Sequence, residues 1–294
     1  MSGTRSKKFR PKPSGAASAS VRRRSGVLWM LPALGLALAV VIVLALVAHH
    51  RASGPPAGSS ARDSGSVPAE VTQGLTGIPL RTFDAAAARG ALRPSLVAPR
   101  RQSPGPAAVL YIGAEYCPYC AALRWPLVVA MARFGSLTGL ALSRSSATDV
   151  FPGTPTFTFL NARYQSPNVT LQTVELQGNV ADATGRYPLL QRPTPTQAAV
   201  LRRYDPQGEI PFLLVGGEYL WIGAPFSPDL LRGDWHTIAA ALPSGRGAAA
   251  QAILGAANEI AAGVCAVNGN SPAAVCHTTG VQEAAQTLPT AGPR

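Results

Sequence analysis

The stretch AAVLYIGAEYCPYC, residues 107–120, decides the fold. Its apolar part, 107–114, predicts a strand that is buried on both faces. The CPYC motif at 117–120 follows that strand and leads into AALRWPLVVAMARF at 121–134, which has the composition of a helix. We expect residues 137–143 to form a second, parallel strand, because a strand, a helical crossover and a parallel strand make a βαβ unit.

The position of the CPYC motif at a helix start predicts a reactive first thiol. The unpaired N–H groups and the dipole of a helix N-terminus favour a thiolate, and the thiolate is the form that attacks a disulfide. Pro118 suits the first helical turn, and Cys120 lies on the same helix face as Cys117. We therefore predict Cys117 as the nucleophile of a thiol–disulfide exchange and Cys120 as the thiol that resolves the mixed disulfide.

Other interpretations of the cysteines stay open from the residues alone. The Cys117–Cys120 pair could be a static structural disulfide. With Cys265 and Cys276 it could also form a four-thiolate zinc site, although ten residues separate the members of the second pair. Haem attachment is excluded because Ala121 stands where a histidine is required. The four cysteines permit three pairings into two bridges. We expect no cofactor and no metal.

Residues beside the motif are candidates for supporting roles. Glu115 could assist proton transfer or be a solvated surface carboxylate. Tyr119 is expected to shape the surface that faces a partner. Arg124 lies one helical turn beyond Cys120 and could steady a thiolate, although an arginine on an exposed helix face is the more common case.

The rest of the chain predicts an α/β protein. Expected helices lie at 196–204, after the capping residue Asp234, and at about 248–262. Two apolar runs around Gly216-Gly217 predict a hairpin. Residues 144–194 are polar and punctuated by Pro and Gly, and we interpret them as an inserted hairpin or small sheet. The expected fold class is a mixed sheet flanked by helices, with an inserted β-rich segment, preceded by one transmembrane helix.

An apolar segment near the N-terminus predicts a membrane anchor. Residues 27–48 form a stretch of about 22 residues without a charge, enough for a helix to cross a hydrocarbon core of ~30 Å. The segment is longer than the apolar core of a signal peptide and lacks a good cleavage site, so we favour an uncleaved anchor over a cleaved leader. The basic residues before it place the N-terminus in the cytoplasm and the later residues outside the cell.

The charge distribution argues against nucleic-acid binding. The net charge is +12, but the first 24 residues carry eight of the 26 Lys and Arg residues and no acid, so the remainder is nearly balanced. All four cysteines lie on the expected outer side, where disulfides persist. The expected organisation is a basic cytoplasmic tail (1–26), a transmembrane helix (27–48), a flexible linker (49–76), an extracytoplasmic domain (77–278, with the insertion at about 144–194) and a disordered tail (279–294).

The order of strand, CPYC, helix, strand, X-Pro and hairpin resembles the thioredoxin fold, and CPYC is familiar from glutaredoxins. Five motifs resemble, more narrowly, the membrane-anchored thioredoxin-like family of domain of unknown function 929. They are GAEYCPYCAALRW at 113–125, FGSL at 134–137, FPGTPTFTF at 151–159, GEIPFLLVGGEYLWIGAPF at 208–226 and GVCAVNGNSPAAVC at 263–276. The resemblance covers roughly residues 75–278. It implies a thioredoxin-like fold, whereas the family has no settled function.

The resemblance also implies roles outside the CPYC motif. Thioredoxin-like domains keep a cis-proline facing the dithiol, so Ile210–Pro211 is expected to be cis and to form a ledge on which a partner's extended chain docks. An ordinary trans-proline before an edge strand is the alternative. Leu123 stands where the family leads us to expect an acidic residue, so the pH behaviour of this chain could differ from that of its relatives.

The last family motif contains the second cysteine pair. Cys265 ends a helix, and Cys276 follows the loop VNGNSP. A bridge between them would close a short loop and stabilise the fold by roughly 3 kcal/mol. It would serve as a structural staple or as a relay that passes electrons to or from Cys117–Cys120.

Together these features predict a membrane-tethered, extracytoplasmic thiol–disulfide oxidoreductase with oxidase- or isomerase-like exchange. The expected partners are thiols of exported proteins or a membrane redox partner. The alternative is a non-catalytic, membrane-anchored thioredoxin-like scaffold or binding module with two structural disulfides. The two differ in whether Cys117 reacts with a small alkylating reagent after mild reduction.

Overall fold

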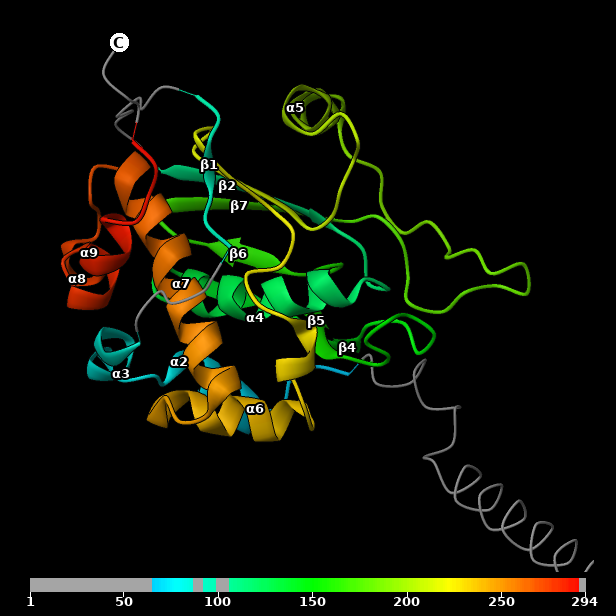
Figure 1. Ribbon diagram of the computed structural model, residues 1–294, viewed down its shortest axis with the longest axis horizontal. Coiled ribbons are helices and arrows are strands. Elements are labelled where there is room, and N and C mark those ends of the chain that lie inside the picture. The colour runs from blue at the N-terminus through cyan, green and yellow to red at the C-terminus, as the bar shows by residue number, and fades with distance from the viewer. Residues whose placement is uncertain (1–64, 87–91, 99–105, 291–294) are drawn as a thin grey trace, which may run out of the picture. The chain divides into compact units, whose positions relative to one another are not determined.

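A computed structural model describes residues 65–86, 92–98 and 106–290 of the chain (Figure 1). The expected basic tail, the expected transmembrane helix at 27–48 and most of the expected linker lie outside the described residues. The described part is a mixed α/β domain in which helices pack against a mixed sheet.

Within the described residues the main sheet has five strands in the order β1-β9-β8-β2-β7. The strands are β1 (Ser95–Leu96), β2 (Ala107–Gly113), β7 (Val169–Glu175), β8 (Phe212–Val215) and β9 (Tyr219–Ile222). β2 pairs parallel with β7 and antiparallel with β8, and β8 and β9 form the predicted hairpin. Gly113 lies opposite Glu175, so the carboxyl ends of the two parallel strands meet at one edge of the sheet.

Helices cover both faces of this sheet (Figure 1). α4 (Pro118–Met131) and α7 (Ala248–Val267) share one hydrophobic core with Val109 and Tyr111 of β2. α5 (Pro195–Tyr204) packs partly buried side chains against a smaller cluster on the opposite face, around Ile112 of β2. Side chains alternate between the two faces of a strand, so Tyr111 and Gly113 point to the face that α4 covers.

α4 and α7 are apolar around most of their circumference, as is typical of helices inside a core. Among the described residues, α7 alone has the length and composition that could cross a membrane, but most of its surface is buried within the domain. We therefore assign α7 as a core helix, and it offers no support for an anchor at 27–48.

Shorter elements complete the domain. Two-stranded sheets join β3 (Ser136–Thr138) to β6 (Arg163–Gln165) and β4 (Ala141–Arg144) to β5 (Pro155–Thr158). The remaining α-helices in the described part are α2 (Ala69–Thr76), α3 (Leu80–Ala85), α6 (Trp235–Ala241), α8 (Ala273–Cys276) and α9 (Thr279–Ala285). Short 3₁₀ helices lie at Pro228–Leu230 and Leu242–Ser244.

Most of the predicted elements are confirmed. The strand at 107–114, the helix after the CPYC motif and the helix at 196–204 lie within a residue or a few of their predicted bounds. Asp234 caps α6 by accepting a hydrogen bond from the Thr237 N–H at 2.8 Å. The helix that begins at 248 is longer than expected and continues to Val267.

The prediction that residues 137–143 form the parallel partner of β2 is wrong. Gly139, with a φ of +68°, interrupts that segment, and its two pieces, β3 and β4, belong to the small sheets. The parallel partner is β7, which comes from the segment that we interpret as an insertion. The β7 sequence VTLQTVE alternates and suits a strand at the edge of a sheet, so residues 144–194 contribute a main-sheet strand as well as the small sheets.

The domain also extends beyond its expected ends. Val71 and Leu75 of α2 are buried, so the prediction of a flexible linker is wrong at 69–76. Val281 and Ala284 of α9 are buried in the main core, so the expected disordered tail needs correction at 279–285. In both helices the buried residues recur at helical spacing, but each helix is too short for that pattern to stand out in the sequence.

Cys265 and Cys276 form the expected bridge, with Cα atoms 5.6 Å apart. The nearby Asn268 side chain donates to the carbonyl oxygen of Asn168, just before β7 begins. The bridge therefore lies at the amino end of the parallel strands, whereas Cys117 follows their carboxyl end. Seven residues of strand separate the two ends, about 20 Å at 3.3 Å per residue. This separation argues for a staple over a relay, and it excludes a zinc site made by all four thiols.

Replacing Cys265 and Cys276 together with alanine is expected to lower the free energy of unfolding by roughly 3 kcal/mol, because the bridge restricts the unfolded chain. Urea denaturation of the oxidised protein measures this loss. The alkylation rate of Cys117 is expected to match that of wild type. A large change in that rate would contradict the assignment of the bridge as a staple.

Candidate functional site

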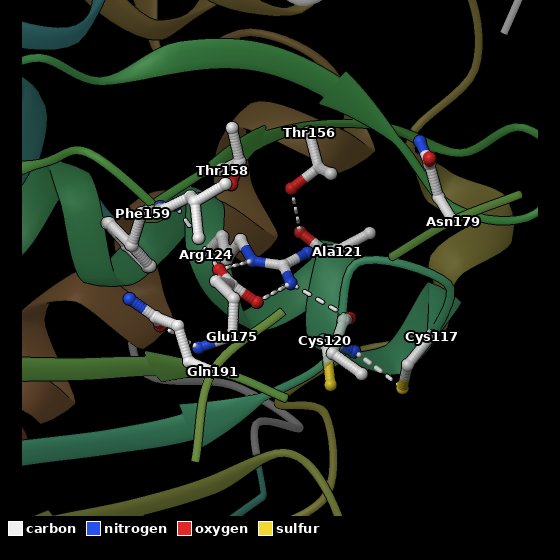
Figure 2. Close-up of polar contacts among 12 residues, drawn as sticks. Cys117, Cys120, Ala121, Arg124, Thr156, Thr158, Phe159, Glu175, Asn179 and Gln191 are labelled. Carbon is white, nitrogen blue, oxygen red and sulfur yellow. Dashed lines mark hydrogen bonds and ion pairs between the residues drawn. The ribbon is translucent and has the colours of Figure 1, made fainter. Parts of the chain in front are cut away.

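The dithiol lies where β2 ends and α4 begins (Figure 2). Cys117 is the N-cap residue of α4, and its sulfur accepts a hydrogen bond from the backbone N–H of Cys120 at 3.2 Å. Pro118 occupies the first helical position, where a missing N–H costs nothing. Both cysteines carry free thiols. The first thiol thus lies at the positive end of the helix dipole.

The two thiols have different environments. Cys117 is 5% exposed, whereas Cys120 is fully buried. A hydrogen bond from the Cys120 side chain lowers the pKa of Cys117, and the Cys120 backbone N–H and the charge of Arg124 lower it further, against the effect of burial. Burial raises the pKa of Cys120 well above its ordinary value, and the neighbouring Cys117 adds to the shift. The pair therefore combines a thiol that ionises readily with a buried one that stays protonated.

A buried ion pair lies beside the dithiol, between α4 and β7 (Figure 2). Arg124 Nη2 lies 2.6 Å from Glu175 Oε2, and Arg124 Nε donates to Glu175 Oε1 at 3.0 Å. Both side chains are completely buried. The contact is bidentate, the strongest geometry for an arginine and a carboxylate.

Backbone contacts hold the ion pair in place. Arg124 Nη2 also donates to the carbonyl oxygen of Ala114 at 2.9 Å, and Glu175 Oε1 accepts from the Phe159 N–H at 3.3 Å. The Glu175 N–H in turn donates to Gln191 Oε1 at 2.7 Å. Burial, the largest single effect, lowers the pKa of Arg124, but the Glu175 carboxylate together with Tyr111 and Cys120 raises that pKa well above its ordinary value. Arg124 therefore keeps its positive charge.

Tyr111 approaches the dithiol from β2. A Cβ atom at Gly113 would overlap the Tyr111 hydroxyl and lie 3.1 Å from Cys120 Sγ. Glycine at 113 therefore leaves room for both the Tyr111 hydroxyl and the Cys120 sulfur beside the strand. The Arg124 guanidinium carbon lies 5.7 Å from the centre of the Tyr111 ring. Tyr111, Arg124 and Cys120 thus form one buried cluster.

Sequence reasoning overlooked Glu175 and Tyr111, and its default placement of Arg124 on an exposed helix face is wrong. Residues four apart lie on the same face of a helix, so Arg124 follows Cys120 into the core. Glu175 is opposite Gly113 in the parallel register. Recognising VTLQTVE as the strand beside β2 would have placed this carboxylate near the motif. Side chains two residues apart in a strand lie on one face. Tyr111 therefore shares a face with Gly113, and this spacing could have identified Tyr111 as a neighbour of the motif.

The structure brings other predicted residues to the same edge of the sheet. The Ile210–Pro211 bond is cis, as expected. Phe212 lies opposite Ile112, so Pro211 falls beside the end of β2. Leu123 is buried and belongs to the main hydrophobic core.

Glu115 and Tyr119 occupy the rim of the motif. Glu115 is partly buried and its backbone N–H donates to the carbonyl oxygen of Gln177 at 2.8 Å. Tyr119 is 42% exposed, and its ring meets the ring of Phe151 edge-on, with centroids 5.9 Å apart. Tyr119 thus presents an exposed aromatic surface next to Cys117, as expected, whereas the backbone contact of Glu115 assigns no role to its carboxylate.

Two loops from residues 144–194 pack against the motif. The ring of Tyr187 stacks on that of Tyr116, with centroids 4.3 Å apart, and the Tyr187 hydroxyl donates to Ser146 Oγ at 2.8 Å. The Ser146 N–H donates to the carbonyl oxygen of Tyr116 at 2.8 Å. The loops therefore limit access to Cys117 and help to fix the backbone just before it.

Where the structure describes the chain, no group of three or more His, Cys, Asp or Glu side chains could hold a metal ion.

Residues 99–266, more than half of the chain, match the family described as Domain of unknown function (DUF929). Neither the curated proteins nor the solved structures contain a match to this chain.

Proposed function

The chain belongs to the family of domain of unknown function 929, and from the geometry of its dithiol we propose that it is a thiol–disulfide oxidoreductase. The observation that carries the proposal is the asymmetry of the pair. Cys117 caps a helix, keeps some exposure and has a lowered pKa, whereas Cys120 is buried and has a raised pKa. Dithiol exchange needs one thiol that ionises and attacks, and a second that resolves the mixed disulfide afterwards.

The topology around the dithiol supports a thioredoxin-like fold as part of this proposal. β2, α4 and β7 make a parallel unit with the dithiol at its first turn, and the antiparallel pair β8–β9 lies on the other side of β2. The cis Ile210–Pro211 bond precedes β8. This order of elements resembles the one that thioredoxin-like proteins use to present a CxxC motif.

The exchange reaction would use the two thiols in turn. A thiolate of a partner dithiol attacks Cys117 Sγ, the Cys117–Cys120 bond breaks, and its electron pair leaves on Cys120 Sγ, which takes up a proton. The partner's second thiolate then attacks the partner sulfur of the mixed disulfide and releases Cys117 as a thiolate. The partner is oxidised to a disulfide and the protein is reduced by two electrons.

The lowered pKa of Cys117 favours this direction. A thiol of low pKa is a good leaving group, so Cys117 departs readily from the mixed disulfide. Stabilising its thiolate also stabilises the reduced form, which makes the disulfide form a stronger oxidant. We therefore propose oxidase- or isomerase-like work on exported protein thiols or with a membrane redox partner.

The proposed location rests on sequence and on the second disulfide. The uncharged segment at 27–48 would anchor the chain, with the basic residues before it in the cytoplasm. The Cys265–Cys276 bridge suits an oxidising compartment outside the cytoplasm. The domain would then meet proteins as they are exported.

A redox titration of the full chain in detergent tests the function. In glutathione and dithiothreitol buffers we expect the Cys117–Cys120 pair to interconvert between about −120 and −270 mV, the span of dithiol enzymes. In the reduced protein Cys117 is expected to be alkylated first, and still at pH values below the ordinary thiol pKa of about 8.5, because its own pKa is lowered.

Mass spectrometry of the alkylated peptides separates the four cysteines. The Cys265–Cys276 pair provides an internal control, because it is expected to stay oxidised throughout the range. A Cys117–Cys120 pair that resists reduction until below about −300 mV would behave as a structural bridge, and the non-catalytic scaffold would then replace the oxidoreductase.

A further inference from the structure

Two buried polar groups in the cluster around the dithiol lack a hydrogen-bond partner. Among the described residues, Tyr111 Oη and Arg124 Nη1 are both inaccessible to solvent and have no hydrogen-bond partner. Leaving a buried donor unpaired costs stability, and folded proteins do so rarely. We therefore expect an acceptor to form near these groups in another state of the protein.

The geometry of the cluster identifies the acceptor. A Cβ atom at Gly113 would overlap Tyr111 Oη and lie 3.1 Å from Cys120 Sγ, so the hydroxyl and the sulfur border the same small space beside Gly113. Arg124 lies one helical turn beyond Cys120, and Figure 2 shows its guanidinium turned toward Glu175. Its Nη2 also donates to the carbonyl oxygen of Ala114, just after the end of β2. Both groups suit an anion, because one is a hydroxyl donor and the other carries a positive charge.

We propose that Tyr111 and Arg124 stabilise the thiolate of Cys120 when it forms during disulfide exchange. The Tyr111 hydroxyl donates a hydrogen bond to the charged sulfur, and Arg124 supplies positive charge nearby. Glu175 is a positioning residue, since its two contacts hold the guanidinium. The inference rests on the proposed function and names the groups that serve its buried thiol.

The Cys120 thiolate appears in both directions of the exchange. When a partner thiolate attacks Cys117 Sγ, the disulfide electron pair leaves on Cys120 Sγ, which then takes a proton from solvent. In the reverse direction the Cys120 thiol releases that proton and its thiolate attacks Cys117 Sγ in the mixed disulfide. The partner sulfur then leaves as a thiolate and is protonated.

Stabilisation is needed here because Cys120 is fully buried. Burial disfavours its charged form, and the pKa of Cys120 is raised accordingly. Donors that lie close to the sulfur lower the cost of forming a charge, since only a small movement brings them to it as the reaction proceeds. In the resting state the Tyr111 hydroxyl has no hydrogen-bond partner among the described residues, so it is available to donate to the sulfur when a charge forms there.

The Tyr111→Phe variant of the full chain tests the inference by removing only the hydroxyl. We expect dithiothreitol to open its Cys117–Cys120 disulfide on the order of tenfold more slowly than in wild type, the effect of losing one hydrogen bond to a charged group. Re-oxidation should slow by the same factor, so the reduction potential should stay unchanged. Acid quenching, alkylation and mass spectrometry at timed intervals measure both rates.

Tyr164→Phe is the matched control. The Tyr164 hydroxyl donates to the carbonyl oxygen of Met131 at 3.0 Å, at the far end of α4 from the dithiol. This variant should exchange at the wild-type rate and lose some stability, because it breaks a hydrogen bond. Reduced Tyr111→Phe protein should unfold at the wild-type temperature or above, because its hydroxyl has no partner to lose.

Two outcomes overturn the inference alone, provided that wild type opens and closes reversibly. One is a Tyr111→Phe disulfide that opens at the wild-type rate. The other is a reduced Tyr111→Phe protein that loses as much stability as Tyr164→Phe, which would mean that the hydroxyl has a resting partner. A wild-type disulfide that dithiothreitol cannot open reversibly overturns the proposed function, and the inference with it.

Discussion

Replacing Cys120 with alanine is expected to stop the attack of Cys117 on a partner disulfide at the mixed disulfide, and to slow release of the partner in that direction by a factor on the order of a thousand or more. Cys117 keeps its position at the start of α4 and can still attack a partner disulfide. In wild type Cys120 then attacks the mixed disulfide from within the same helical turn. Oriented groups of this kind reach effective concentrations of about 10⁵ M or more, far above any millimolar thiol in solution.

Covalent adducts on non-reducing gels measure this effect. We expect the Cys120→Ala chain to accumulate adducts with exported proteins or with a membrane redox partner, and reducing agent to release them. The Cys117→Ala chain is the control and should form none, because the remaining thiol is fully buried. Adducts that form through Cys120 in that control would mean that the two roles are reversed. Equal absence of adducts in both variants would favour the scaffold.

Local features of the sequence sufficed to predict the dithiol and much of the fold. A buried strand that ends in CPYC at a helix start determines which thiol faces the dipole, and the hairpin of β8 and β9 follows from two apolar runs around a glycine pair. These signals depend on neighbours in the chain. The choice of β7 as the parallel partner depends on non-local pairing, and the polar alternation of VTLQTVE resembles that of any edge strand.

The buried ion pair could not be predicted from the sequence for a related reason. Arg124 and Glu175 are 51 residues apart, and each taken alone has the sequence signature of a surface residue. Buried charges occur when they are paired, so neither burial could be predicted without the contact between α4 and β7. Tyr111 could not be recognised for a different reason. An aromatic residue in a buried strand is ordinary packing, and only the structure shows that Gly113 leaves room for the Tyr111 hydroxyl close to the sulfur.

Replacing Arg124 with methionine is expected to lower the free energy of unfolding by about 3–5 kcal/mol, because it leaves the Glu175 carboxylate buried without its counter-charge. The double variant Arg124→Met/Glu175→Gln should recover most of this loss, since replacing a whole buried ion pair with neutral groups is often close to neutral. The introduced glutamine would keep an acceptor for the Phe159 N–H, which now donates to Glu175 Oε1. Urea denaturation of the wild type and the two variants measures the difference, and single and double variants of equal stability would contradict it.

The double variant also separates the fold from the chemistry. Arg124 lowers the pKa of Cys117 through its charge, so a folded protein without that charge should need a higher pH for the same alkylation rate at Cys117. Loss of the charge near Cys120 should also slow opening of the disulfide, as the Tyr111→Phe substitution is expected to do. If the double variant is stable and exchanges at the wild-type rate, the buried pair serves only to join α4 to β7. If it is stable and slow, the charge beneath the dithiol acts on the sulfur chemistry itself.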